Sequence, residues 1–213
     1  PSGRIFLSDI RVLDHRGDTL MAIDSVRARI KRSSLWTGRL AFRQADLYGP
    51  KVRVIKYPGE DRSSLALFLD HLKGEKKKPF YLDIARARLL SGEFSFRDDE
   101  KAQYEAVQNL SLGLSGLSIA PGDYRATLDS LQAQGRDGSR IRHLSGEFRF
   151  APRGIIADGV KLLTEYSDLS FSASAYLPEK DSTSQTLGQR LRQGEFSLSV
   201  DPSHIDPRDV RPF

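Results

Sequence analysis

Apolar and polar residues alternate along most of the chain, which is the period-two pattern of β-strands with one apolar face. The alternation is clearest at residues 110–114, where leucines alternate with serine and glycine, and at residues 169–177. Strand-like segments of this kind occupy residues 4–14, 18–31, 39–48, 51–57, 80–90, 92–98, 103–108, 122–134, 140–151, 154–165 and 194–200. The pattern therefore predicts an all-β fold.

Short turn sequences such as Pro121-Gly122-Asp123 separate these segments. Hairpins need only such short connections, whereas parallel strands need long crossovers, so a mostly antiparallel meander is expected. Alternation leaves two arrangements open: two sheets closing on each other as a sandwich, or one sheet curled so that its apolar face stays open. We favour the second, a long twisted sheet curled into a groove or half-pipe with one short helix.

One segment breaks the period of two and predicts that helix, at residues 63–73. Ser63 and Ser64 are N-cap candidates, an apolar stripe follows, and Gly74 suits a helix end. A helical turn is expected at residues 33–38, with Trp36 packed beneath it.

We expect residues 1–213 to form a single β-rich unit with two parts. Residues 1–74 form an N-terminal part that contains the turn and the helix. A charged linker at 75–79 then leads to repeating β units at 80–213, which are interrupted by a polar loop at 178–193.

A short sequence, Gly-Glu-Phe, recurs at residues 92–94, 146–148 and 194–196, and the first two copies follow a serine. We expect the glycine to allow a bulge or a positive φ where each strand enters the sheet, with the following aromatics all facing one side. Such repetition is typical of a recurring supersecondary unit and not of a single catalytic site.

The apolar face of a curled sheet could hold acyl chains by burial alone, which is not directional. The alternation predicts nine side chains facing this groove. They are Phe94, Phe96, Leu110, Leu112, Leu114, Phe148, Phe150, Leu169 and Phe171.

The charge of the chain changes this picture little. A net charge of +5 and a pI near 9.5 suit an anionic partner. Basic residues alternate with apolar ones at residues 26–31 and 51–54, however, as on the solvent side of a half-buried strand. We therefore expect solvated strand faces with at most a weak attraction to anionic lipid headgroups, and no nucleic-acid partner.

Cysteine is absent, which excludes disulfides and thiolate metal sites. No stretch approaches the roughly 18 apolar residues of a spanning helix. The chain starts at Pro1, so we expect it to be a piece of a longer protein whose targeting or anchoring segment lies elsewhere.

Candidate chemistry is sparse. The histidines, His15, His71, His143 and His204, lie far apart, without ligand spacing for a metal. The acidic run at 98–100 could supply the carboxylate pair of a hydrolase, but a charged turn explains it more simply. We therefore expect no enzyme activity, no cofactor and no metal.

Three stretches carry a resemblance to a known family. Residues 17–69 combine a strand ending in basic residues, a turn at 33–38, and a strand with the pattern apolar-x-Gly-Pro-x-Val around Gly49-Pro50. Residues 143–177 contain a Thr-x-x-Ser-x-Leu strand formed by Thr164, Ser167 and Leu169. Residues 200–213 resemble a Ser-x-Ile-x-Pro-x-Asp-Leu connector, with Val210 in the leucine position.

Together these stretches resemble the TamB/AsmA-like envelope proteins, particularly the N-terminal periplasmic part of Bacteroidetes-type TamB. The resemblance implies a curled β-sheet with a hydrophobic groove in the periplasm of a Gram-negative bacterium, with an anchor in the inner membrane. It also implies phospholipid or another acyl lipid as ligand, and a role in lipid transport or, with outer-membrane assembly proteins, in outer-membrane biogenesis.

Two other classes remain open. A sandwich that binds glycans or peptides would have a closed core and an exposed aromatic platform, for which Trp36 and Tyr57 are the candidates. A hydrolase would need two acids converging in a cleft, with Asp98 and Glu100 as the candidates.

Overall fold

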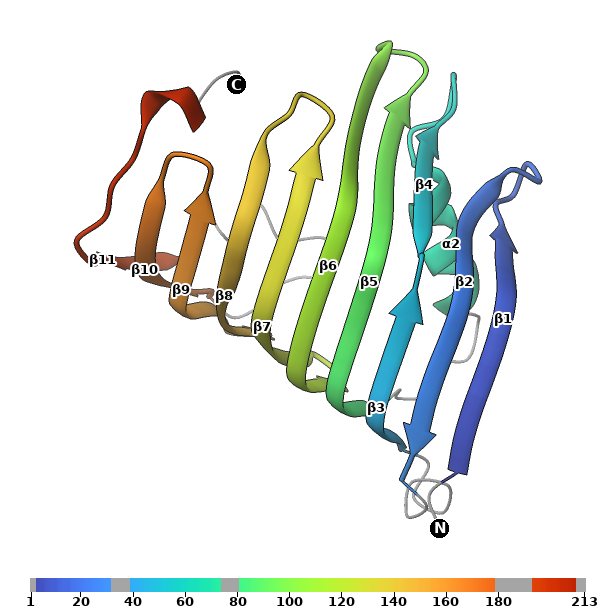
Figure 1. Cartoon of the computed structure of the whole chain (residues 1–213), viewed down its shortest axis with the longest axis horizontal. Helices are drawn as coiled ribbons and strands as arrows, with labels where there is room; N and C mark the ends of the chain where they lie inside the picture. The colour runs from blue at the N-terminus through green and yellow to red at the C-terminus, as the bar shows by residue number, and fades with distance from the viewer. Residues whose placement is uncertain (1–2, 32–38, 74–80, 179–192, 210–213) are drawn as a thin grey trace.

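The computed structural model describes residues 3–31, 39–73, 81–178 and 193–209. The described strands form one 11-stranded, mostly antiparallel sheet, which confirms the predicted all-β fold. Figure 1 shows a long sheet that is twisted and curled, with its strands bending near one end. The two-sheet core of a sandwich is not found in the described part of the chain.

The expected segments and the observed elements agree closely. The strands are β1 (Gly3–Leu13), β2 (Thr19–Ile30), β3 (Leu40–Tyr48), β4 (Lys51–Lys56), β5 (Leu82–Asp98), β6 (Gln103–Ala120), β7 (Asp123–Gly135), β8 (Arg140–Ala151), β9 (Gly154–Thr164), β10 (Asp168–Tyr176) and β11 (Glu195–Val200). Within the described ranges, the helices are α2 (Ser64–Lys73) and the short 3-10 helix η1 (Pro207–Asp209). The turn near Trp36, the linker 75–79 and nearly all of the loop 178–193 lie outside the described residues.

The sheet departs from a pure meander at one place. Strands β3 and β4 lie end to end between β2 and β5, antiparallel to β2 and parallel to β5. Parallel neighbours require a crossover, and the segment that contains α2 supplies it. In Figure 1 the helix lies against β4, behind the sheet.

Helix α2 begins as the sequence predicts and is joined to the sheet at its first residue. The Ser63 hydroxyl accepts the Ala66 N–H at 3.4 Å, so Ser63 is the N-cap. The buried Ser64 hydroxyl accepts the Ile55 N–H of β4 at 2.9 Å. That bond satisfies a buried backbone donor that would otherwise be costly.

Two of the recurring glycines lie inside strands, which corrects the expectation that they mark strand entry. Gly92 lies within β5 and Gly146 within β8, each next to a register shift. The positive φ beside Gly92 belongs to Ser91, at 55°. A Cβ on Gly92 would lie 2.5 Å from Leu89 Cδ2, so this glycine leaves room for a neighbouring side chain. The predicted bulges are confirmed, but they interrupt strands instead of starting them.

The molecule is one layer thick over most of its length. Each strand packs mainly against its neighbours in the sheet, and α2 packs against β4. The chain exposes 14738 Å2, whereas a compact monomer of its mass, 23.9 kDa, exposes roughly 9,900 Å2. Most buried apolar side chains in the described residues lie on β2, β3 and β4 or directly after β4. These are Leu20, Ile23, Ala28, Ala45, Val54, Ile55 and Tyr57.

Tyr57 ties the segment after β4 to the turn between β1 and β2. Its hydroxyl lies 2.7 Å from a carboxylate oxygen of both Asp14 and Asp18. Burial and the two carboxylates raise the pKa of the phenol. The Arg16 guanidinium lies over the ring, 4.3 Å from its centroid. Tyr57 is therefore a core residue and not the exposed aromatic platform that a glycan-binding module would need.

The two C-terminal motifs of the sequence meet in a cluster that we call the clasp, formed by Thr164, Ser167, Asp206 and Asp209. The hydroxyls of Thr164 and Ser167 each donate to Asp209 Oδ2 at 2.6 Å. The Asp206 N–H donates to Ser167 Oγ at 3.0 Å. The clasp therefore holds η1 against the turn between β9 and β10.

Replacing Ser167 with alanine is expected to loosen the clasp. Its hydroxyl is buried and serves two partners, so its loss should cost about 1 to 2 kcal/mol locally. Amide exchange at Asp206 should accelerate by about 5- to 30-fold. The control Ser197→Ala, at an exposed position of β11, should leave exchange at Asp206 unchanged. Equal protection in the two variants would contradict the role given to Ser167.

Candidate functional site

A continuous row of aliphatic side chains crosses nine strands of the sheet. Residues directly opposite each other on neighbouring strands project to the same face, so pairing register shows which side chains align. The register aligns Leu7, Val26, Leu47, Leu89, Leu112, Leu131, Leu144, Leu162 and Leu169. We call this the leucine row, and it runs along the long axis of the sheet, across the strands.

Two further apolar rows lie beside the leucine row. One contains Ile5, Ala28, Ala45, Ala87, Leu114, Leu128, Gly146, Val160, Phe171 and Val200. Within this row, Val160 packs against Gly146, which has no side chain to keep it away. The other contains Leu40, Leu82, Ile119, Tyr124, Phe150, Ile155, Ala175 and Phe196. One face of the sheet is thus apolar from β3 to β10.

The nine predicted groove residues all belong to this apolar pattern. Leu112 and Leu169 lie in the leucine row, and Leu114, Phe171 and Phe150 lie in the rows beside it. Phe148 pairs with Ala126 and Ala157, and Leu110 pairs with Gly92. Like these two residues, Phe94 and Phe96 lie outside the rows. Phe94 pairs with Val52 and Val107, and Phe96 pairs with Val54 and Glu105.

Phe94 and Phe96 are set off from the leucine row by two irregular residues. Ser91 on β5 and Asn109 on β6 both have positive φ, at 55° and 52°. These irregularities mark register shifts between β5 and β6. The apolar face therefore has a main region formed by the three rows and a second region where β4, β5 and β6 pair.

The prediction missed most members of the three rows. Val26, Leu47, Leu131, Leu144 and Leu162 align with the predicted leucines but were not named from the sequence. Alternation within their own strands carries the signal for Val26, Leu131 and Leu144, each of which is flanked by polar residues. Their alignment across the sheet depends on register, which single-strand patterns do not encode.

No second layer covers the apolar face in the described residues, apart from α2 beside β4. Leu112, Leu131 and Leu144 are only half-buried. Exposure rises toward β11, where Phe196 is 65% and Leu198 66% exposed. A soluble protein rarely exposes so large a contiguous apolar surface unless that surface binds something.

The opposite face is polar, as alternation requires. The residues aligned there include Arg27, Asp46, Arg88, Gly113 and Ser130. Asp46 accepts two hydrogen bonds from the Arg88 guanidinium, at 2.8 and 3.0 Å, which hold the pKa of its carboxyl below the usual range. The two faces therefore differ in chemistry, and only one of them suits acyl chains.

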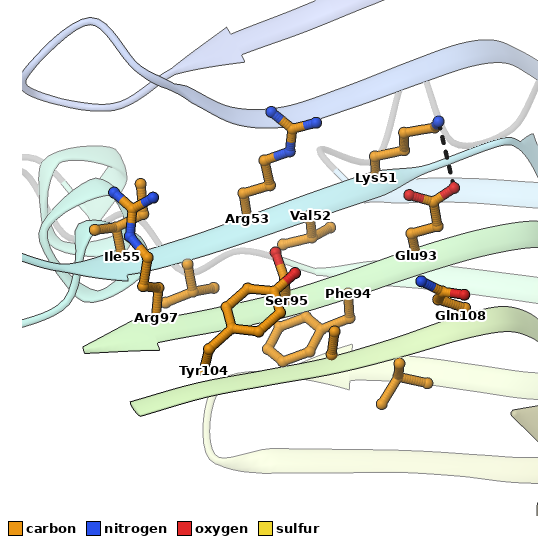
Figure 2. A pocket seen from close by; sticks show the side chains of 13 residues that line it. Lys51, Val52, Arg53, Ile55, Glu93, Phe94, Ser95, Arg97, Tyr104 and Gln108 are labelled. Carbon is orange, nitrogen blue, oxygen red and sulfur yellow. Dashed lines mark ion pairs between the residues drawn. The ribbon is translucent and has the colours of Figure 1, made fainter. Parts of the chain in front are cut away.

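A polar pocket of about 300 Å3 lies on this second face, over β4, β5 and β6 (Figure 2). Lys51 and Glu93 form an ion pair at 3.3 Å on its rim. Arg53 and Tyr104 also line it. Glu93, the acidic residue of the pocket, is thus engaged by a lysine and has no second carboxylate beside it in the pocket lining.

The proposed carboxylate pair at 98–100 is organised as a turn. Asp98 Oδ1 accepts the N–H groups of Glu100 and Lys101, at 3.0 and 3.1 Å. Lys56 Nζ lies 3.6 Å from Asp98 and 3.8 Å from Glu100. Burial raises the pKa of Asp98, but the two N–H donors and the lysine outweigh it, so the carboxyl stays below its ordinary pKa. A hydrolase acid would need the opposite shift.

Two of the four histidines have partners in the structure. His15 contacts Glu60, and the backbone of His204 pairs with Asp168. Within the described ranges, no group of three potential ligands could hold a metal ion. Among the described helices, none is long and apolar enough to cross a membrane.

Comparison with known proteins adds no family to this picture. Neither the protein-family models nor the curated proteins that were searched contain a match to this chain. The apolar face itself is therefore the basis for proposing a function.

Proposed function

We propose that the chain is a non-enzymatic lipid-binding segment of a TamB/AsmA-like envelope protein. Its apolar face holds the acyl chains of phospholipids or related lipids during transport or outer-membrane assembly. The observation that carries the proposal is the leucine row, an apolar track that crosses nine strands without a polar interruption.

The dimensions of the track suit acyl chains. Neighbouring strands lie about 4.8 Å apart, so nine strands span roughly 38 Å. One leaflet contributes about 15 Å of hydrocarbon to a bilayer. A lipid tail therefore covers less than half of the leucine row, which leaves room for movement along it.

The chemistry of the track also favours movement over fixed binding. Burial of each CH2 group contributes about 0.8 kcal/mol wherever along the track it occurs. Leucine and alanine side chains offer no hydrogen bonds that would fix a lipid at one position. The apolar face thus behaves as a continuous surface and not as a single pocket.

The cellular setting follows from the sequence resemblance and belongs to the same proposal. The segment works in the periplasm of a Gram-negative bacterium, within a protein anchored in the inner membrane. Its partners are acyl lipids and the proteins that assemble the outer membrane. No nucleic acid is involved.

The proposal can be tested by measuring the phospholipid that stays bound to the protein during purification. Native mass spectrometry of protein from bacterial membranes should detect bound phospholipid. Leu131→Asp, at the middle of the leucine row, should lower the bound amount by about tenfold or more, because a carboxylate there would have to lose its water.

The control is Gln132→Asp, on the same strand but on the opposite, exposed face. It adds the same carboxylate and should leave bound lipid unchanged. Circular dichroism should show that both variants keep the β-sheet. A wild-type protein free of lipid, or equal losses in the two variants, would contradict the proposal.

A further inference from the structure

The polar face carries a basic pocket at the β1 end of the sheet. It has a volume of about 430 Å3. Its charged lining consists of Arg4 on β1, Arg27 and Arg29 on β2, Asp46 on β3 and Arg88 on β5. The pocket therefore has four guanidinium groups and one carboxylate, a net charge of +3.

Two of these arginines face each other directly. Arg4 pairs with Arg29 across β1 and β2, and Gln44 follows on β3. Like charges at directly opposite positions destabilise a sheet unless an anion lies between them. In the described part of the chain, neither side chain has an ion pair or a hydrogen bond.

Arg27 is held in place by aromatic rings. Its guanidinium carbon lies 5.8 Å from the Phe6 ring centroid and 5.3 Å from that of Tyr48. These contacts orient the guanidinium but use none of its N–H donors. Arg27 therefore presents its hydrogen-bond donors to the pocket.

The pocket carboxylate is engaged mainly by the fourth arginine, Arg88. Asp46 is 4% exposed, and the Arg88 guanidinium holds both of its oxygens. Gln44 Nε2 donates to Asp46 Oδ2 as well, at 2.6 Å. Asp46 thus already accepts three hydrogen bonds, and it is the one carboxylate among the lining residues. Arg27, opposite Asp46 on β2, is attracted to it without a hydrogen bond, while Arg4 and Arg29 have no counter-charge among the lining residues.

We propose that this basic pocket binds a phosphate group, carried by a lipid headgroup or free in solution. Guanidinium groups match phosphate oxygens in paired hydrogen bonds, and a dianionic phosphate offsets more of the +3 charge than a carboxylate does. Arg4, Phe6, Arg27 and Arg29 alternate with residues of the apolar rows, so they lie on the opposite face. The site is therefore separate from the acyl-chain track and does not depend on it.

The substitution Arg29→Glu separates binding from folding. The introduced carboxylate faces Arg4 and replaces a repulsion with an attraction, so the urea midpoint should stay the same or rise. Phosphate affinity should fall by about tenfold or more, because a donor becomes a repelling charge. The matched control is Arg11→Glu, an exposed position on β1 outside the pocket with the same change of charge.

Two probes distinguish the sources of the phosphate. Isothermal titration with inorganic phosphate and with pyrophosphate tests free anions. Cosedimentation with phosphatidylcholine vesicles, with and without phosphatidic acid, tests headgroups. Binding in either assay that Arg29→Glu weakens and Arg11→Glu preserves supports the site and names its source. Absence of binding in both assays, or equal weakening by the two variants, overturns it.

Discussion

Alanine in place of Leu20 is expected to lower the free energy of unfolding by about 3 to 5 kcal/mol. Leu20 is fully buried, and it directly precedes the two residues of β2 that pair with β4. The small core on β2, β3 and β4 lies where the sheet departs from its meander. A cavity there removes packing between strands that have few other buried contacts.

Urea unfolding followed by circular dichroism measures this effect. The matched control is Leu198→Ala, which removes the same atoms from a side chain that is 66% exposed. Its free energy of unfolding should change by less than about 0.5 kcal/mol. Similar losses in both variants would mean that the core does not lie where the structure places it.

Alanine in place of Gly146 is expected to cost about 2 to 3 kcal/mol. Gly146 has a φ of 152°, which L side chains rarely adopt. An added Cβ would lie 3.1 Å from Val160 Cα and 3.3 Å from the Asp158 carbonyl oxygen. Both atoms belong to the backbone of the neighbouring strand, so neither can move aside without breaking the register of β8 and β9.

Gly138→Ala is the control for Gly146→Ala. Gly138 also has a positive φ, 88°, but its Cβ would meet no atom within 4 Å. This variant should cost only about 1 to 2 kcal/mol, the strain of a left-handed backbone. If Gly146→Ala costs no more than the control, contact with β9 is not the reason for that glycine.

The strands themselves could be predicted because their signal is local. Alternation at 140–151 and 154–165 predicted β8 and β9 almost to the residue. Ser63 predicted the start of α2, because an N-cap residue binds backbone N–H groups only a few residues away. Both signals need only a few neighbouring residues.

Other features depend on residues far apart in the chain. The parallel pairing of β3 and β4 with β5 follows from where the α2 crossover returns, and no local pattern encodes that. The recurring glycines were predicted at strand starts, which is confirmed for Gly194 directly before β11. Gly92 and Gly146 lie inside strands instead, where they leave room for side chains of the same or a neighbouring strand. Gly92 accommodates Leu89, and Gly146 accommodates Val160.

The candidate site also has features that a single strand predicts and features that depend on cross-strand pairing. Nine groove residues could be named from single strands, and all nine fall in the apolar pattern. The leucine row appears only once the register aligns residues such as Leu47, Leu112 and Leu162. The basic pocket was predicted only as a solvated face, because the Arg4–Arg29 pair and the hydrogen bonds from Arg88 to Asp46 are products of cross-strand pairing.

Photo-crosslinking with a phospholipid that carries a photoreactive group in its acyl chain tests the central claim most directly. Mass spectrometry of the digested protein identifies the residues that the acyl chain touches. The apolar-face account predicts crosslinks on residues of the leucine row, such as Leu112, Leu131 and Leu144, spread over several strands. Crosslinks confined to the polar face, or absent altogether, would contradict it.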